Sequence, residues 1–444
     1  MSLDGRSFRN VLAFGLNAIA PLSMHTKSSL KLAHEVDASG QSFEKVLEIM
    51  SREVSIPTSK KSNSTFDEKD LHRSLIELSI SNGFAESLPE SFAVNEPLLS
   101  GKVPSGSWIR KTVEKINADE MVLKLQEALN STVKQLISFK IFSAPIIAGV
   151  DTQKIKRYDP NADGGFLRRG KSERGTSTFE ENMTLQCVEA GRRAQIACEH
   201  FALFDEKSEE LRKLILNSKA LQIEIALLLI DRGFFDCKTI NMLNRMHQLF
   251  LMPCIKNSGI KRAIMEYVER KREFISEYTM GSGDGSCKFT LVILPKAGSS
   301  EKETNPLKKY IAFATSIGKG DILRNISRLP KDYRMRWGLE TGYVGVGLLR
   351  ARTTSRNHTL RLLYFYYALI LYNAWLLANL ILASRLNVFH LIIKEPIIRL
   401  QLLKDVFHRM IVESILIEAY GLRYADEGGQ PTEVSRSDVG HNPI

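Results

Sequence analysis

Apolar residues recur at helical spacing in the first third of the chain. Three stretches show this periodicity: 67–80, from about 105 to 116, and 118–137. A polar run of Ser, Thr, Lys and Asn before them has the composition of a linker. We therefore predict that residues 1–62 form an N-terminal segment ending in a linker, and that residues 63–143 form a helical domain.

The role of this helical domain stays open at the level of sequence. A helix-turn-helix that binds DNA fits the pattern, although no turn signature places one. A domain that serves only packing or dimerisation fits the pattern equally well. DNA binding by residues 63–143 is therefore one of two alternatives.

The pattern changes to short apolar runs from residue 144 onward. The run 144–150 is rich in β-branched residues, and the segments 184–188 and 194–197 flank a Gly-containing turn, as the strands of a hairpin do. The nearly unbroken apolar run 223–230 predicts a central strand that is buried on both faces.

Helical stretches alternate with these strands. Residues 207–221 and 238–246 have helical patterns, and residues 249–255 form a further apolar run. Three strands, a helix, a strand, a helix and a strand is the order of a ribonuclease-H-like α/β domain. We place this domain at residues 144–258.

Residues 259–330 interrupt that order and are predicted to be an insertion. They contain a charged helical stretch at 261–278, a glycine-rich loop, and two strand candidates at 288–294 and 310–315.

The helical pattern resumes at residue 331. We predict that residues 331–422 hold a helix with Glu340 and the C-terminal helices, and that the polar tail 423–444 is disordered. The predicted fold class is α/β. It has a ribonuclease-H-like mixed-sheet core with flanking helices, an N-terminal helical region, and an insertion before the last catalytic helix.

Composition and charge narrow the function classes. The chain has 444 residues, of which 43% are hydrophobic and 25% charged, as in an ordinary soluble globular protein. Its net charge of +11 favours a polyanionic partner such as DNA or RNA. The five cysteines are scattered and form no C-x-x-C pair, which argues against a disulfide framework or a zinc site and fits a reducing cytoplasm.

Two apolar segments require a decision about membranes. Residues 11–22 follow two arginines as a signal peptide would, but Asp4 and Asn17 interrupt that pattern. Residues 360–383 are long enough to span a bilayer, yet they contain Arg361, Asn373 and Asn379. We predict a buried helix in a soluble protein, and a single-span membrane protein is the alternative.

Three acidic residues stand out by their positions. Asp151 follows the first predicted core strand, Asp231 follows the central strand, and Glu340 lies on the helix after the insertion. Acids at the C-terminal ends of adjacent strands point into the crevice where α/β sheets bind ligands. Converging carboxylates need cations, and hard oxygen ligands select Mg²⁺ or Mn²⁺. Two such ions can clamp a phosphodiester.

Each acid also has a purely structural interpretation. Asp151 fits a turn, in which case Asp159 or Asp163 is the alternative ligand. Asp231 fits an N-cap of the helix that follows it, and Glu340 fits an ion pair one helical turn from its neighbour Arg336. The combination on a basic chain with this strand order favours the functional interpretation.

The helix predicted from residue 331 carries further chemistry. Tyr333, Arg336 and Glu340 are spaced three and then four apart, which places them on one face of a continuous helix. An acid that holds a metal and an arginine that holds a phosphate are the groups that phosphoryl transfer requires.

Four passages of the chain carry a resemblance. They are Gly149-Val150-Asp151-Thr152, Leu228-Leu229-Ile230-Asp231-Arg232-Gly233-Phe234-Phe235, Tyr333-Arg334-Met335-Arg336-Trp337-Gly338-Leu339-Glu340-Thr341, and Arg352-Thr353-Thr354-Ser355-Arg356-Asn357 with the apolar helix 360–377 after it. Together they resemble a DDE-type insertion-sequence transposase with a Tyr-Arg-Glu signature, of a group common in archaea. The resemblance extends roughly from residue 105 to residue 385.

The resemblance implies a ribonuclease-H-like core, two Mg²⁺ or Mn²⁺ ions, and Asp151, Asp231 and Glu340 as catalytic residues and metal ligands. The expected DNA-binding residues are Tyr333, Arg336, Arg350, Arg352, Arg356 and Lys256. The wider group often has a lysine seven residues after the glutamate, but Gly347 occupies that position here. Arg350 and Arg352 are the nearest cations that can replace it.

The function implied is cutting and rejoining of DNA at the ends of an insertion sequence. The expected partner is double-stranded DNA, both the element ends and the target. The protein is expected to act as a homodimer when the ends are synapsed. It is expected in the cytoplasm, with no membrane partner. A metal-dependent nuclease of the same fold is the first alternative. A catalytically degenerate DNA-binding protein is the second.

Overall fold

The computed structural model describes residues 26–56, 66–158, 167–173, 175–202, 205–296, 303–388, 396–424 and 431–433. The chain divides into two compact units. The helical unit comprises Met1–Phe139 and Val344–Ile444, and the sheet unit comprises Lys140–Tyr343. The predicted linker and most of the predicted disordered tail lie outside the described residues.

Long helices build the helical unit. They are α2 (Thr26–Glu53), α3 (Glu68–Ser81), α4 (Leu88–Asn95), α5 (Gly106–Val113), α6 (Ala118–Ser138), α14 (His358–Leu386) and α16 (Leu400–Tyr420). The short strands β10 (Leu422–Tyr424) and β11 (Pro431–Glu433) pair antiparallel. Side-chain caps set the helix starts: Asp67 caps α3, Asn117 caps α6, and Asn357 caps α14. The helical character predicted for 67–80 and 118–137 is confirmed.

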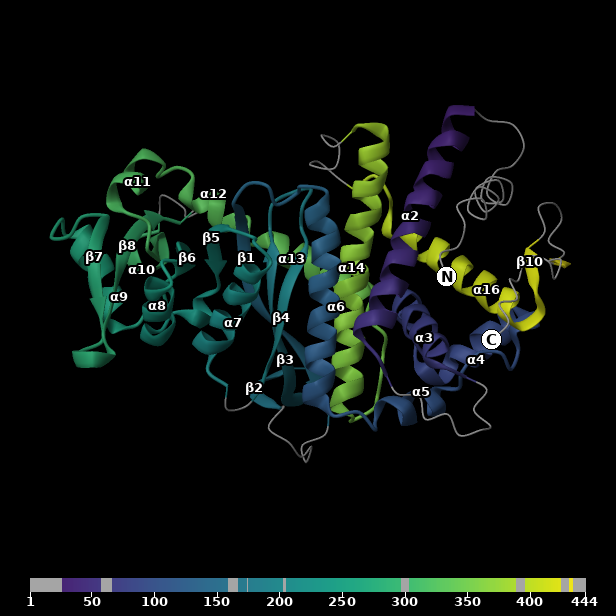
Figure 1. The fold of residues 1–444 in the computed structure, drawn as a ribbon. Helices are drawn as coiled ribbons and strands as arrows, with labels where there is room; N and C mark the ends of the chain where they lie inside the picture. The colour runs from purple at the N-terminus through teal and green to yellow at the C-terminus, as the bar shows by residue number, and fades with distance from the viewer. Residues whose placement is uncertain are drawn as a thin grey trace. The chain divides into compact units, whose positions relative to one another are not determined.

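Helix α14 is the core of the helical unit, and its predicted burial is confirmed. It runs beside α2 and α6 (Figure 1). It has the length and composition of a membrane span, but 83% of that window is buried inside the structure. The polar residue Asn379 lies in this interior and has protein partners: its amide nitrogen donates to Trp375 O, and its oxygen accepts from Ile398 N. Solubility of the chain stays a prediction.

Helix α2 lies within residues 26–53, where the sequence pattern predicted only an N-terminal segment. Its middle is rich in small residues, including Ala38, Ser39 and Ser42, all of them fully buried. Small side chains contribute little to a hydrophobic pattern, but they allow close packing of helices. Ser42 Oγ donates to Ala374 O of α14 at 2.6 Å, so tertiary packing stabilises this helix.

One mixed sheet forms the centre of the sheet unit. Its strands are β1 (Ile146–Arg157), β2 (Arg168–Glu173), β3 (Thr176–Cys187), β4 (Gln195–Phe201), β5 (Ile225–Ile230), β6 (Phe250–Pro253), β7 (Ile275–Met280), β8 (Cys287–Pro295) and β9 (Tyr310–Thr315). The order is β2-β3-β1-β5-β6-β9-β8-β7, with β4 also paired to β3. The pairs β1–β5 and β5–β6 are parallel, whereas the other pairs are antiparallel.

The helices of this unit lie between and after the strands. They are α7 (Lys207–Ala220), α8 (Cys237–Arg245), α9 (Ser258–Val268), α10 (Pro306–Lys309), α11 (Lys319–Arg324), α12 (Leu329–Arg334) and α13 (Trp337–Leu348), which crosses into the helical unit. The predicted helices near 207–221 and 238–246 and the predicted β3–β4 hairpin are confirmed. An α/β fold with a mixed sheet and flanking helices is therefore present.

Two predictions about these elements are wrong. The charged stretch 261–278 is not one helix, because α9 ends at Val268, Arg270 adopts a left-handed conformation with φ of 60°, and β7 follows. Pairing of β7 with β8 outweighs the local helical pattern. The central strand β5 is fully buried only in its second half, over Leu228, Leu229 and Ile230. The strands of residues 259–330 extend the same sheet as the core strands.

Candidate active site

The sheet places Asp151 and Asp231 at neighbouring positions. Strands β1 and β5 run parallel, and their last register pair is Val150 with Ile230. Each aspartate is the next residue after that pair. The prediction that the strand ends at Asp151 is wrong. Strand β1 continues to Arg157 against β3 after β5 has stopped. Its carboxylate therefore comes from the middle of a strand, at the point where one neighbour leaves the sheet.

Asp231 is not a helix cap by its side chain. It precedes the short 3₁₀ turn Arg232–Phe234 in an extended conformation and makes no side-chain capping hydrogen bond. The next helix, α8, is capped by Asp236, whose carboxylate accepts from Thr239 N at 2.8 Å. Asp236, and not Asp231, is therefore the N-cap of this helix. The Asp231 carboxylate is available for other contacts.

Glycines allow α13 to lie directly on the sheet. A Cβ added at Gly149 would lie 2.9 Å from Leu339 Cδ1, and one added at Gly338 would lie 2.8 Å from Val188 O. Leu339 is fully buried in the cluster that includes Leu229, Leu251 and Phe313. This packing fixes the first turn of α13, so Glu340 is held beside the ends of the parallel strands.

The continuous helix predicted for Tyr333, Arg336 and Glu340 is wrong. Helix α12 ends at Arg334 and α13 begins at Trp337, so Arg336 lies in the turn between them. The hydrogen bonds in this turn span three residues, including Arg336 N to Tyr333 O at 3.1 Å. Arg336 nevertheless remains close to Glu340, one helical turn later, at 3.8 Å.

The guanidinium of Arg336 meets all three candidate acids. Its Nη1 donates to Asp151 Oδ2 at 2.9 Å. Its Nη2 lies 4.0 Å from Asp231 Oδ1 and 3.8 Å from Glu340 Oε1. The Arg336 side chain is 15% exposed, whereas that of Glu340 is 59% exposed. The structure thus brings these three carboxylates together around one cation.

Burial and like charge act on the groups of this site. Burial raises the pKa of Asp151, and the charge of Asp231 adds to the effect, although hydrogen bonds from Thr152 N and Arg336 oppose it. Burial raises the pKa of Tyr333 to about 12, so its phenol keeps its proton at neutral pH. Burial lowers the pKa of Arg336, but contacts with Tyr333, Asp151 and Asp231 outweigh it and the net pKa is raised.

Two further residues of the site were missed by sequence reasoning. Tyr343 donates to the carbonyl of Asp151 at 3.1 Å and shares a 2.7 Å hydrogen bond with Thr184, so it fixes the backbone of Asp151. Lys207, at the start of α7, donates to Gly233 O at 3.0 Å, two residues from Asp231. Their roles depend on contacts between distant segments, for which the sequence offers no local signal.

The other residues expected to bind DNA lie in different surroundings. Lys256 donates to the carbonyls of Leu307 and Tyr310, and burial lowers its pKa. Arg350, Arg352 and Arg356 belong to the helical unit. Burial lowers the pKa of Arg350, and Arg352 Nε donates to Asn82 Oδ1 at 2.7 Å. A DNA-binding role for these four residues stays a prediction.

The donor atoms of this site suit a divalent metal ion, but their positions in this structure do not form a metal site. Its donors are carboxylate oxygens, the chemistry that Mg²⁺ and Mn²⁺ prefer. Within the residues that the structure describes, however, no group of three or more His, Cys, Asp or Glu side chains is close enough to hold an ion. The guanidinium of Arg336 lies among the three acids instead. The alternative ligands Asp159 and Asp163 lie outside the described residues.

Comparisons with known proteins add a distant likeness. No family model matches the chain, and no curated protein matches its sequence. A solved structure with a similar fold is described as the piggyBac transposase synaptic complex with hairpin DNA, determined by cryo-EM. The two chains are 10% identical, the match covers 92% of this chain and 81% of the other, and the TM-score is 0.49. A likeness this distant carries no weight for function.

Proposed function

We propose that this protein is a DDE-type transposase that cuts and rejoins DNA at the ends of an insertion sequence. The observation that carries the proposal is the meeting of Asp151, Asp231 and Glu340 around Arg336, at the edge where β1 and β5 end their parallel pairing. Ligands of α/β sheets bind at this kind of edge. The substrate is double-stranded DNA, which fits the net charge of +11.

The sheet topology supports a ribonuclease-H-like core. The strands β4, β3 and β1 are antiparallel neighbours, and β5 and β6 follow in parallel on the other side of β1. This is the arrangement expected from the order of three strands, helix, strand, helix and strand. Strands β7 to β9 then represent the insertion, added to the open edge beyond β6.

The carboxylates of Asp151, Asp231 and Glu340 would hold two Mg²⁺ or Mn²⁺ ions, which supply activation of the attacking oxygen and stabilisation of the leaving oxygen. Arg336 would bind a phosphate oxygen of the substrate through charge-assisted hydrogen bonds. Tyr333, which keeps its proton, donates a hydrogen bond to a phosphate oxygen. Lys207 supplies a cation near Asp231, in a protein that has Gly347 where the wider group often has lysine.

The same residues serve two consecutive steps. Water attacks the phosphodiester at the element end and breaks its bond to the 3′-oxygen. The freed 3′-hydroxyl then attacks a phosphodiester of target DNA, from which the target's own 3′-oxygen leaves as a hydroxyl. Each step is an in-line transfer with oxygen as nucleophile, so the three acids keep the same roles. We further propose that the protein acts in the cytoplasm, and that two copies act together when the element ends are synapsed.

The test uses the full chain and labelled duplexes that contain the DNA flanking its gene. With Mg²⁺ or Mn²⁺ we expect strand cleavage at the element end and joining of that end to target DNA. Asp151→Asn keeps the acceptor for Thr152 N but loses the charge, and we expect cleavage to fall about 10³-fold or more. The matched control is Asp284→Asn at an exposed position of the same unit.

The other outcomes distinguish the alternatives. Metal-dependent cleavage without preference for the element ends, and without joining, would identify a nuclease of the same fold. DNA binding with no cleavage under any metal would identify a degenerate DNA-binding protein. Cleavage that survives Asp151→Asn would refute the assignment of the acids.

A further inference from the structure

The acids of the candidate site are undercompensated by protein charge. Within the described residues, every ion pair of Asp151, Asp231 and Glu340 is made to the single cation Arg336. Three carboxylates therefore share one ion-pair partner, while the nearby Lys207 donates to the carbonyl of Gly233 instead. Carboxylates that converge in this way repel one another.

Arg336 contacts the three acids at unequal distances. Only the bond to Asp151, at 2.9 Å, has the length of a hydrogen bond. The distances of 4.0 Å to Asp231 and 3.8 Å to Glu340 allow only a looser electrostatic contact. Both oxygens of Asp151 therefore accept a hydrogen bond, from Thr152 N and from Arg336. Asp231 and Glu340 receive none from the guanidinium, so their oxygens remain available to a smaller cation with a higher charge.

The surroundings give the guanidinium a second partner. The Tyr333 side chain interacts with Arg336 and raises the pKa of the guanidinium. Its ring packs edge-on against Phe313 at 5.4 Å between centroids. Arg336 itself lies in the turn between α12 and α13. The side chain can therefore leave Asp151 and stay beside Tyr333 without unfolding either helix.

We propose that Arg336 is an exchangeable internal counter-ion: its guanidinium occupies the cation position of the metal-free site and is displaced from Asp151 by divalent metal. Displacement frees the guanidinium for the phosphate of the substrate. Metal loading and phosphate binding are thereby coupled in that order, and the free protein is protected from electrostatic repulsion. This inference rests on the proposed function, since it assumes that the three acids hold metal.

The direct consequence is competition between arginine and metal. In the wild-type protein, an ion must break the bond from Arg336 to Asp151 before it can use Oδ2. Removal of the guanidinium removes that competitor and increases the negative potential at the site. A residue that merely supports the fold would not weaken metal binding by its presence.

The test measures Mn²⁺ affinity of the metal-free full chain in the absence of DNA, by titration calorimetry or by the electron paramagnetic resonance signal of free Mn²⁺. We expect Arg336→Met to bind Mn²⁺ about tenfold more tightly than the wild type. Arg334→Met removes the same charge two residues earlier, at an exposed position of α12, and should change the affinity by less than about twofold. Asp151→Asn should abolish the binding.

A second variant keeps the test decisive if Arg336→Met folds poorly. Arg336→Lys retains the charge but not the planar fork, and its Mn²⁺ affinity should lie between those of the wild type and Arg336→Met. Mn²⁺ should also raise the melting temperature of either variant more than that of the wild type. Unchanged or weaker Mn²⁺ binding in both variants, or no Mn²⁺ binding by any of the proteins, would overturn the proposal.

These readouts separate the two proposals. Metal competition without end-specific cleavage would leave the counter-ion role intact and refute the transposase. Cleavage that depends on Asp151, with Mn²⁺ affinity indifferent to Arg336, would support the transposase and refute the counter-ion.

Discussion

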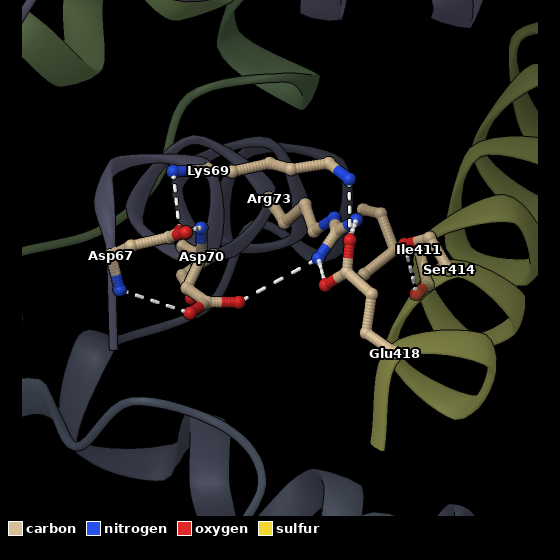
Figure 2. A network of polar contacts seen from close by, with 8 residues as sticks. Asp67, Lys69, Asp70, Arg73, Ile411, Ser414 and Glu418 are labelled. Carbon is tan, nitrogen blue, oxygen red and sulfur yellow. Dashed lines mark hydrogen bonds and ion pairs between the residues drawn. The ribbon is translucent and has the colours of Figure 1, made fainter. Parts of the chain in front are cut away.

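Two arginines, one in each unit, are surrounded by acids in different ways. In the helical unit, Arg73 of α3 is 2% exposed and makes two hydrogen bonds to Glu418 of α16, at 2.5 and 2.7 Å (Figure 2). Asp70 lies 3.6 Å from it, and Lys69 also contacts Glu418. Two cations face two anions there. In the sheet unit, three anions share Arg336 as their one ion-pair partner among the described residues.

The acids respond in opposite directions. Burial alone would raise the pKa of Glu418, but hydrogen bonds from Arg73 and Lys69 lower it to about 2. Burial raises the pKa of Asp151, and its one good hydrogen bond to Arg336 does not reverse the effect. A balanced network holds its acid ionised and joins two helices. An unbalanced one leaves an excess of negative charge, which is characteristic of a site that binds a cation.

The largest expected effect is on catalysis. Arg336→Ala should lower strand cleavage about a hundredfold, or ~2.7 kcal/mol, because a charge-assisted contact to phosphate is lost in the transition state. Single-turnover cleavage of the labelled element end measures it, with Arg334→Ala as the control. Near-normal cleavage together with a small loss of stability would show that Arg336 is a structural partner of its acids, like Arg73.

The next largest effect is on the stability of the helical unit, when either Glu418 or Arg73 is replaced. Glu418→Gln leaves the buried Arg73 without its main partner and should cost about 2 kcal/mol of unfolding free energy, less than a fully buried pair because Glu418 is 45% exposed. Arg73→Met removes the buried charge and fills its space, so it should cost less than about 1 kcal/mol. Denaturant unfolding of both variants compares them. Equal losses of unfolding free energy in the two variants would mean that the Arg73–Glu418 ion pair itself decides stability, and not the buried charge of Arg73 that is left without its partner.

A buried polar residue provides a third test within the helical unit. Asn379→Leu removes the acceptor of Ile398 N and should cost about 1–2 kcal/mol, because a buried N–H loses its partner. The control Asn95→Leu, at an exposed position on α4, should stay within about 0.5 kcal/mol. Thermal unfolding in detergent-free buffer measures both. A gain in stability, or a requirement for detergent, would indicate that α14 faces lipid.

The smallest effect is a dependence on pH. The pKa of Glu418 is lower in the folded protein than its ordinary value of 4.5, so the ionised side chain stabilises the helical unit at pH values above 4.5. This contribution disappears as the pH falls toward 2. The difference in melting temperature between the wild type and Glu418→Gln should therefore shrink over that interval. Asp151, with its raised pKa, has the opposite sign: its folded form binds a proton more readily, and the stability that this provides is lost as the pH rises through the folded pKa. A difference that stays constant to low pH would contradict the network in Figure 2.

The sequence by itself determined the elements whose patterns are local. Periodicity predicted α3 and α6, and the apolar runs predicted most core strands, because burial of one face leaves a periodic record. The positions of Asp151 and Asp231 after apolar runs were also visible. Helix α2 was not, since its small buried residues carry meaning only through their fit against α14.

Only the tertiary structure decided how the candidate acids are compensated. The spacing of Tyr333, Arg336 and Glu340 predicted one helical face, but packing of Leu339 on the sheet beside Gly149 is accompanied by a break before α13. Arg336, in this break, donates to Asp151, a residue 185 positions earlier. Tyr343 and Lys207 join the site for the same reason. Charge compensation acts through space, so a linear pattern identifies the acids but not the cation that neutralises them.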